Sequence, residues 1–261
     1  MRTQQRTQQR TQERTQPRAG SLDHDVAMLL AATEYDRVVA LLAALSPQQW
    51  SAPTDCLGWD VRDVAGHLLG MAQMAAGLPE MARQQLASQR RVRRAGGSPL
   101  DALTAHQVEK NAHLSTSGVV EAMRRVGPRA ARARRRTPSF VRARTLPGHQ
   151  DVGDQSETWT VGYMLDVILT RDPFLHRVDI TRATGAVMQC DAAHEGVIVD
   201  DVVREWAERH GAPYDLVLTG AAGGHWRRGE AERIERDAFE FCRVLSGRSA
   251  GTGSLAQRVP F

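Results

Sequence analysis

The chain has 261 residues, 41% hydrophobic and 25% charged, which is typical of a soluble globular protein with a full core. Its apolar stretches are too short to span a membrane. The formal charge of +4 is supplied by the first twenty residues, where five arginines stand against one glutamate, so the rest of the chain is about neutral.

The cysteines indicate a reducing compartment. Cys56, Cys190 and Cys242 are far apart and form no CxxC pair, which argues against a disulfide framework. The polar, arginine-bearing first twenty residues also lack the apolar core of a secretion signal. We therefore expect a cytoplasmic protein that is not bound to a membrane.

The N-terminal residues are repetitive. Residues 2–17 read RTQQ, RTQQ, RTQE, RTQP, a polar tract that cannot build a core. We predict a disordered low-complexity tail over residues 1–20 and prefer this to a basic nucleic-acid-binding arm, which is the less favoured alternative.

The first helices follow this tail. Apolar residues at helical spacing predict a helix over 21–45, with Ser21 as its cap. Prolines and a glycine in 46–59 predict a loop, and a second helix is expected to begin near Asp60. Its end is poorly marked, and we place it before the break at 96–99.

The remaining bundle helices are less sharply bounded. Residues 100–136 predict one or two helices, and the prolines and glycines of 137–157 predict a long loop. A last long helix is expected over 158–184, closed by Gly185. Together these helices predict an antiparallel four-helix bundle over 21–186.

The C-terminal part has a different residue pattern, in which strand-like and helical segments alternate. Residues 187–261 predict a small α+β domain, so that the protein is mainly α overall. Its expected elements are a helix at 195–209, strands at 214–219 and 225–228 around a glycine turn at 221–224, and a helix at 233–246.

Two motifs in the bundle have the spacing of metal ligands. Asp172 and His176 are four residues apart, so they share one helix face, and His67 lies on the inward stripe of the second helix. Two histidines and a carboxylate leave a coordination position open, as in catalytic zinc sites. Asp63 and Asp179 lie one turn from the histidines and are expected to orient their rings.

The same segments resemble a known family. QQWSAPTDCLGWDVRDVAGHLLG is similar to the signature of the mycothiol-dependent maleylpyruvate isomerase family, within the DinB-like group of four-helix metalloproteins, and TRDPFLHRVDI is similar to its second ligand motif. The resemblance implies that His67, Asp172 and His176 bind zinc. DLVLTGAAGGHW and IERDAFEFCRVLSGR resemble the family's small sterol-carrier-like domain, which implies a catalytic role for Arg248.

The sequence departs from the family pattern at the acidic ligand. Asp172 stands where the isomerase has glutamate, and Pro173, which follows it, removes a helix N–H group. A kink here would either compensate for the shorter side chain or spoil the site.

The resemblance implies a function. We expect a zinc-dependent enzyme, or one using another divalent metal, with mycothiol as thiol cofactor and an electrophilic small molecule as substrate. The reaction would be isomerisation or S-transfer and conjugation. The alternatives are a non-enzymatic metal- or ligand-binding sensor or carrier, and a nucleic-acid-associated stress protein.

Two further groups are interpreted without a functional role. Cys56 is expected to be a small buried hydrophobe outside the ligand set. The arginines between Arg124 and Arg144 lack interleaved aromatic residues, so they predict a solvated face, and we do not expect nucleic acid as a partner.

Overall fold

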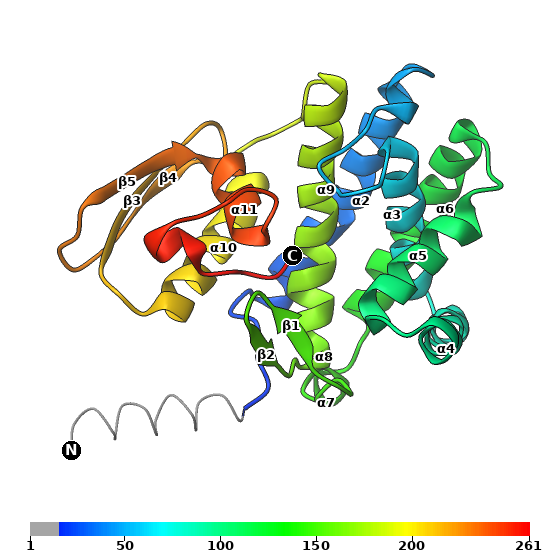
Figure 1. Cartoon of the computed structure of the whole chain (residues 1–261), viewed down its shortest axis with the longest axis horizontal. Helices are drawn as coiled ribbons and strands as arrows, with labels where there is room; N and C mark the ends of the chain where they lie inside the picture. Colours follow the sequence, from blue (N-terminus) through cyan, green and yellow to red (C-terminus); the bar gives the residue numbers. More distant parts are fainter. Residues whose placement is uncertain (1–15) are drawn as a thin grey trace.

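The computed structural model describes residues 16–261, so most of the predicted tail lies outside the described residues. Figure 1 shows a group of helices on one side and a smaller unit of helices and strands on the other. The long helix α9 (Leu169–Thr184) runs between them. None of the described helices is long and apolar enough to cross a membrane.

Four helices form the bundle. Helices α2 (His24–Ala44) and α3 (Val61–Ala75) each pack against both α6 (Thr116–Arg135) and α9. Their apolar stripes meet in one core, whose largest members include Leu42, Trp50, Leu69 and Met123. The predicted mainly helical fold with a bundle is confirmed.

Side-chain caps set where the first two helices begin. The Asp23 carboxylate, rather than the predicted Ser21, accepts the backbone N–H groups at the start of α2. Asp60 caps α3, and Asp63 returns a bond to the Asp60 N–H group in a capping box. This start places Val64, His67 and Leu68 on the buried side of α3.

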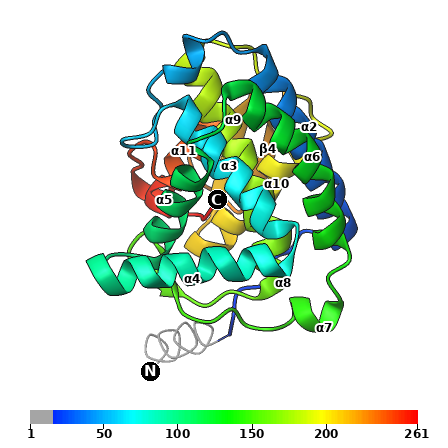
Figure 2. The same ribbon diagram turned by 90° about the vertical axis from the view of Figure 1, so that its right-hand side faces the viewer.

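The second predicted helix is in fact two helices. Helix α3 ends at Ala75, and α4 (Leu78–Ala95) starts after Gly77 with Pro79 in its first turn. Proline suits a first turn because its missing N–H group has no partner there. Helices α4 and α5 (Pro99–Asn111) pack on each other and on α3, and α4 crosses the end of the bundle (Figure 2).

The predicted loop at 137–157 contains short elements: α7 (Ser139–Arg142) and the hairpin β1 (Gln150–Val152) with β2 (Gln155–Glu157). Arg18 lies along the segment that follows. Its N–H group donates to Thr158 at 2.8 Å, and its carbonyl accepts from Thr160 at 2.9 Å. Arg18, within the predicted tail, is therefore paired with this segment.

The last bundle helix is interrupted near its start. A short helix α8 (Val161–Tyr163) leads into one wide turn of π-helix (Met164–Ile168), and α9 follows directly. Gly185, at φ 68°, ends α9 in the left-handed conformation that glycine adopts without strain.

The C-terminal unit is a small α+β arrangement. Helix α10 (Glu195–His210) precedes a sheet of three strands, β3 (Tyr214–Thr219), β4 (Gly224–Arg228) and β5 (Arg233–Asp237). Their order in the sheet is β4-β3-β5, and β3 is antiparallel to β4 and parallel to β5. Residues 233–237 form a strand, and not the start of the predicted helix, because Asp237 caps the next helix, α11 (Ala238–Ser246). A short 3-10 turn (Gly253–Ala256) follows.

Helix α9 belongs to two cores. Phe174, Leu175 and Val178 pack with the apolar residues of the C-terminal unit, whereas Ile180 packs in the bundle core. Side chains from both halves of the chain therefore meet along α9, which carries two of the predicted metal ligands.

Candidate metal centre

The three predicted ligands lie together. His67 reaches from α3 and His176 from α9, and the Nε2 atom of each ring lies 3.5 Å from Asp172 Oδ1. The two imidazole rings meet edge to face, with centroids 5.2 Å apart. One ligand atom from each residue lies within 4.8 Å of the others, which is close enough for all three to contact one ion.

The Asp172 carboxylate is incompletely satisfied. Among the described residues, its Oδ2 atom is buried and has no hydrogen-bond partner. Burial raises the pKa of Asp172, but attraction to His176 and His67 outweighs it and holds that pKa well below its usual range. An ionised carboxylate with a buried unpaired oxygen is costly unless a cation contacts it. This donor set therefore fits a divalent metal ion.

His176 has a charged partner behind it. Its Nδ1 atom lies 3.0 Å from Asp179 Oδ2, as the spacing of the two residues predicts. Burial lowers the pKa of His176, but Asp172 and Asp179 outweigh this effect and raise it well above its usual value.

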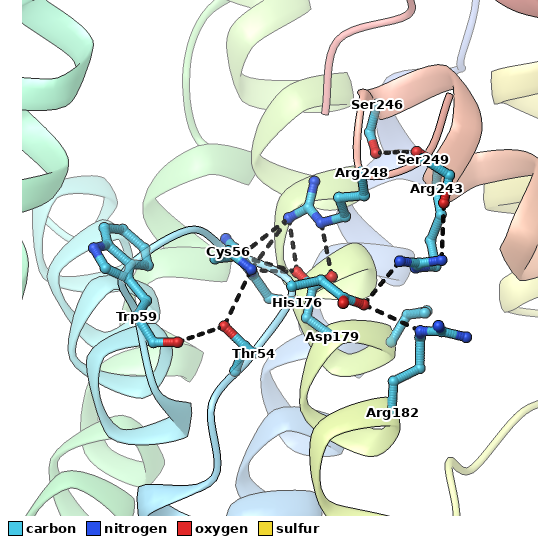
Figure 3. Close-up of polar contacts among 12 residues, drawn as sticks. Thr54, Cys56, Trp59, His176, Asp179, Arg182, Arg243, Ser246, Arg248 and Ser249 are labelled. Atoms are coloured by element: carbon cyan, nitrogen blue, oxygen red, sulfur yellow. Dashed lines mark hydrogen bonds and ion pairs between the residues drawn. The ribbon is translucent and has the colours of Figure 1, made fainter. Parts of the chain in front are cut away.

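Arg248 joins this pair from the C-terminal unit. Its Nε and Nη2 atoms each donate to one Asp179 oxygen at 2.7 Å (Figure 3). Burial raises the pKa of Asp179, whereas His176 and Arg248 lower it to about 2. The structure thus brings Arg248, predicted from the motif LSGR, next to His176, with Nη2 3.5 Å from its Nδ1 atom.

Asp63 does not have its predicted role. Its carboxylate is used in the α3 capping box, and burial raises its pKa. The Nδ1 atom of His67 instead lies 2.8 Å from Oε1 of Gln107, a fully buried residue of α5. Gln107 could not be predicted from the sequence, because forty residues separate it from His67 and no spacing pattern connects the two residues.

Cys56 lies at the edge of the centre, and not in the core as predicted. It is half-buried, and its thiol donates to Asp179 Oδ2 at 3.4 Å and lies 3.8 Å from His176 Nδ1. The loop is held locally, since the Thr54 hydroxyl accepts the Cys56 N–H group (Figure 3). A second metal ion could in principle be contacted by Cys56, His176 and Asp179, whose ligand atoms lie within 4.8 Å of one another. The Arg248 guanidinium, however, already supplies a positive charge there.

Comparison with known proteins agrees with this picture. The family described as mycothiol maleylpyruvate isomerase N-terminal domain matches residues 31–181. The chain belongs to this family. The matched segment contains His67, Asp172, His176 and Asp179, while Arg248 lies beyond it.

Solved structures show the same fold. The crystal structure of the mycothiol-dependent maleylpyruvate isomerase has a TM-score of 0.53 and 15% sequence identity, over 88% of this chain and 91% of that one. A histidine-to-alanine mutant of that isomerase gives the same TM-score at 14% identity and the same coverage. No curated protein matches the sequence.

This member of the maleylpyruvate isomerase family accommodates Pro173 without breaking α9. A residue at this position would normally donate its N–H group to the carbonyl of Leu169. That carbonyl instead accepts from Arg134 Nη1 at 3.0 Å, and Arg134 Nη2 donates to the Leu165 carbonyl at 2.5 Å. Arg134 is therefore a buried structural residue, contrary to the predicted solvated face.

A second group of residues close enough together to hold a metal ion surrounds Arg177 of α9. Glu34, His194 and Glu195 are buried together. Arg177 contacts both glutamates, and Arg37 contacts Glu195. Since these guanidinium groups already compensate the carboxylates, this cluster is best described as an ion-pair network that fixes α2, α9 and α10 together.

Proposed function

We propose that this chain is a zinc-dependent enzyme that uses mycothiol as a thiol cofactor for isomerisation, or for S-transfer or conjugation, of an electrophilic small molecule. Family membership and the fold shared with a mycothiol-dependent isomerase support this proposal. The observation that carries it is the buried, unpartnered Oδ2 atom of Asp172 beside two histidine Nε2 atoms.

His67, Asp172 and His176 would hold zinc or another divalent ion. When bound, the ion would lower the pKa of a coordinated thiol and polarise a substrate oxygen at neutral pH. One carboxylate leaves one positive charge on a divalent ion, and Asp179 is balanced by Arg248. The site as a whole therefore favours a ligand with a single negative charge, such as a thiolate.

Arg248 is suited to bind the anionic part of a substrate. Two of its nitrogens are held by Asp179, which fixes the plane of the guanidinium. Among the described residues, the third nitrogen, Nη1, makes no hydrogen bond, and 17% of the side chain is exposed. A fixed donor of this kind stabilises negative charge that develops in a transition state.

Asp179 positions both partners. It orients the His176 ring through Nδ1 and holds Arg248 through two bonds. Loss of Asp179 would therefore disturb the ligand and the substrate-binding arginine at once.

Metal content tests the site directly. Elemental analysis of the purified protein is expected to give close to one zinc per chain, and His67→Ala and His176→Ala are each expected to lose it. His113→Ala is the control, because His113 is exposed and outside the cluster. A wild-type protein that binds no zinc even when zinc is supplied would refute the metal centre.

Turnover tests the chemistry. The zinc-loaded protein is expected to consume an electrophile only when mycothiol is present, with maleylpyruvate as the probe for isomerisation and monobromobimane as the probe for conjugation. Arg248→Ala is expected to bind zinc but to lose turnover. Zinc binding without thiol-dependent turnover of either probe would favour the alternative of a metal-binding sensor or carrier.

A further inference from the structure

His67 is connected to a distant carboxylate through two buried glutamines. His67 Nδ1 lies 2.8 Å from Gln107 Oε1, and Gln107 Nε2 donates to Gln84 Oε1 at 3.0 Å. Gln84 Nε2 in turn donates to Glu80 Oε1 at 3.0 Å. Both glutamines are fully buried, so water does not compete for these bonds.

The direction of every bond in this chain is fixed from its far end. Gln84 Nε2 faces two acceptors, Glu80 Oε1 and the Gly70 carbonyl, the latter also at 3.0 Å. The nitrogen of the Gln84 amide must therefore lie on that side, and its oxygen must face Gln107. Gln107 then donates with its nitrogen and accepts with its oxygen, which requires a hydrogen on His67 Nδ1.

Glu80 stays charged at the end of the chain. Burial raises the pKa of Glu80, but bonds from Lys110 and Gln84 lower it below its usual value overall. Lys110, the only lysine of the sequence, contacts Glu80 Oε1 at 2.5 Å. All donors between His67 and Glu80 therefore point toward a carboxylate.

The helices are packed to allow this arrangement. A side chain at Gly70 would place its Cβ atom 2.5 Å from Gln107 Cβ, so only glycine lets α5 approach α3 this closely. The neighbouring Gly66 carbonyl accepts from Asn111 at 2.9 Å, which fixes α5 at a second point one turn away.

We propose that Gln107 and Gln84 are positioning residues that link His67 to Glu80. They hold the Nδ1 atom of His67 protonated and direct the His67 Nε2 lone pair to the metal position beside Asp172. Carboxylates that contact a metal-binding histidine directly orient its ring and increase its basicity. Here the side-chain amides of Gln107 and Gln84 stand between His67 and the Glu80 carboxylate and connect them indirectly. The inference rests on the metal centre of the proposed function but not on the identity of the reaction.

Zinc affinity measured by competition with a chelator tests the link. Gln107→Leu is expected to weaken zinc binding 10- to 100-fold, the range found when such outer partners are removed. Gln84→Leu is expected to weaken zinc binding less than Gln107→Leu does, and Glu80→Gln is expected to have the smallest effect of the three. Gln85→Leu is the control, because Gln85 is exposed on the same helix as Gln84 and lies outside the chain of bonds to His67.

Unchanged zinc affinity in folded Gln107→Leu and Gln84→Leu proteins would overturn the proposal, even if the enzyme turns over its substrate. If the variants follow the expected order of zinc affinity but the zinc-loaded wild-type protein shows no turnover, only the proposed reaction is refuted. The metal-free wild-type protein gives an independent readout by nitrogen-15 NMR of the histidine rings. We expect a hydrogen on Nδ1 of His67, and its absence would also overturn the proposal.

Discussion

At the scale of single residues, Asp179 links the two halves of the site. It is fully buried, yet it contacts the His176 ring of α9, the Cys56 thiol in the loop before α3 and the Arg248 guanidinium of the C-terminal unit. Its low pKa, about 2, reflects His176 and Arg248 overcoming the effect of burial. Such a carboxylate is stable only while its partners remain in place.

A double-mutant cycle tests this coupling. Asp179→Asn and Arg248→Gln are each expected to lower the free energy of unfolding of the metal-free protein by about 3 kcal/mol, because each leaves a buried charge without its partner. The double variant should lose about 1–3 kcal/mol less than the sum. Urea unfolding provides the measurement, with Arg182→Gln, which alters a more exposed pair, as control. Strict additivity would contradict the coupling.

The sequence predicted local relations better than distant ones. Asp179 follows His176 by three residues on one helix, so helical geometry alone placed its carboxylate beside the ring. Asp63 has a similar spacing to His67 but is used by the helix cap, whose backbone N–H groups are nearer. Gln107 and Cys56 depend on the packing of separate elements, which no spacing along the chain expresses.

At the scale of elements, Arg134 stabilises α9 at its weakest point. Pro173 leaves the Leu169 carbonyl without its usual helical donor, and the Arg134 side chain donates to this carbonyl and to that of Leu165 in the π-turn. The sequence predicted a kink at Pro173, whereas α9 continues through this residue and the irregular turn lies before it, at 164–168. It did not predict that Arg134 donates to the carbonyl groups near Pro173, because a buried arginine within an arginine-rich segment cannot be told from its exposed neighbours.

Replacing this arginine should be costly. Arg134→Met keeps much of the side-chain volume but removes the donors to the buried Leu169 carbonyl and to the Thr170 hydroxyl, and we expect a loss of about 2–5 kcal/mol in the free energy of unfolding. Arg132→Met is the matched control, because Arg132 is exposed on the same helix, and it should change stability by less than about 0.5 kcal/mol. Equal effects of the two substitutions in urea unfolding would show that Arg134 does not support α9.

At the scale of the whole molecule, buried arginines of α9 hold the C-terminal unit against the bundle. Arg171 bonds Asp201 and Glu205 of α10. Arg177, on the same helix, contacts Glu34 of α2 and Glu195 at the start of α10. Since Arg248 reaches Asp179 only while the unit is docked, these ion pairs also maintain the site. The sequence predicted both units but not that they share α9, because the charged residues concerned look like surface residues.

Glu205 should make this docking sensitive to acid. Burial raises its pKa, but Arg171 and Arg209 lower it to about 2 from an ordinary 4.5. A lowered folded-state pKa contributes stability above the unfolded value, and this contribution is lost as pH falls toward 2. The shift corresponds to about 3 kcal/mol at neutral pH, of which about 2 kcal/mol disappears between about pH 6 and pH 3.

Comparing a variant with the wild-type protein isolates this contribution. Glu205→Gln cannot be deprotonated, so the difference in unfolding free energy between wild type and variant should shrink by about 2 kcal/mol from about pH 6 to pH 3. Glu208→Gln, at a position whose side chain is 71% exposed on the same helix, should show no such change. A difference for Glu205→Gln that stays constant with pH would mean that the carboxylate holds its charge no more strongly in the folded protein than in the unfolded chain. The docking of the C-terminal unit would then depend on Asp201 and the apolar contacts along α9.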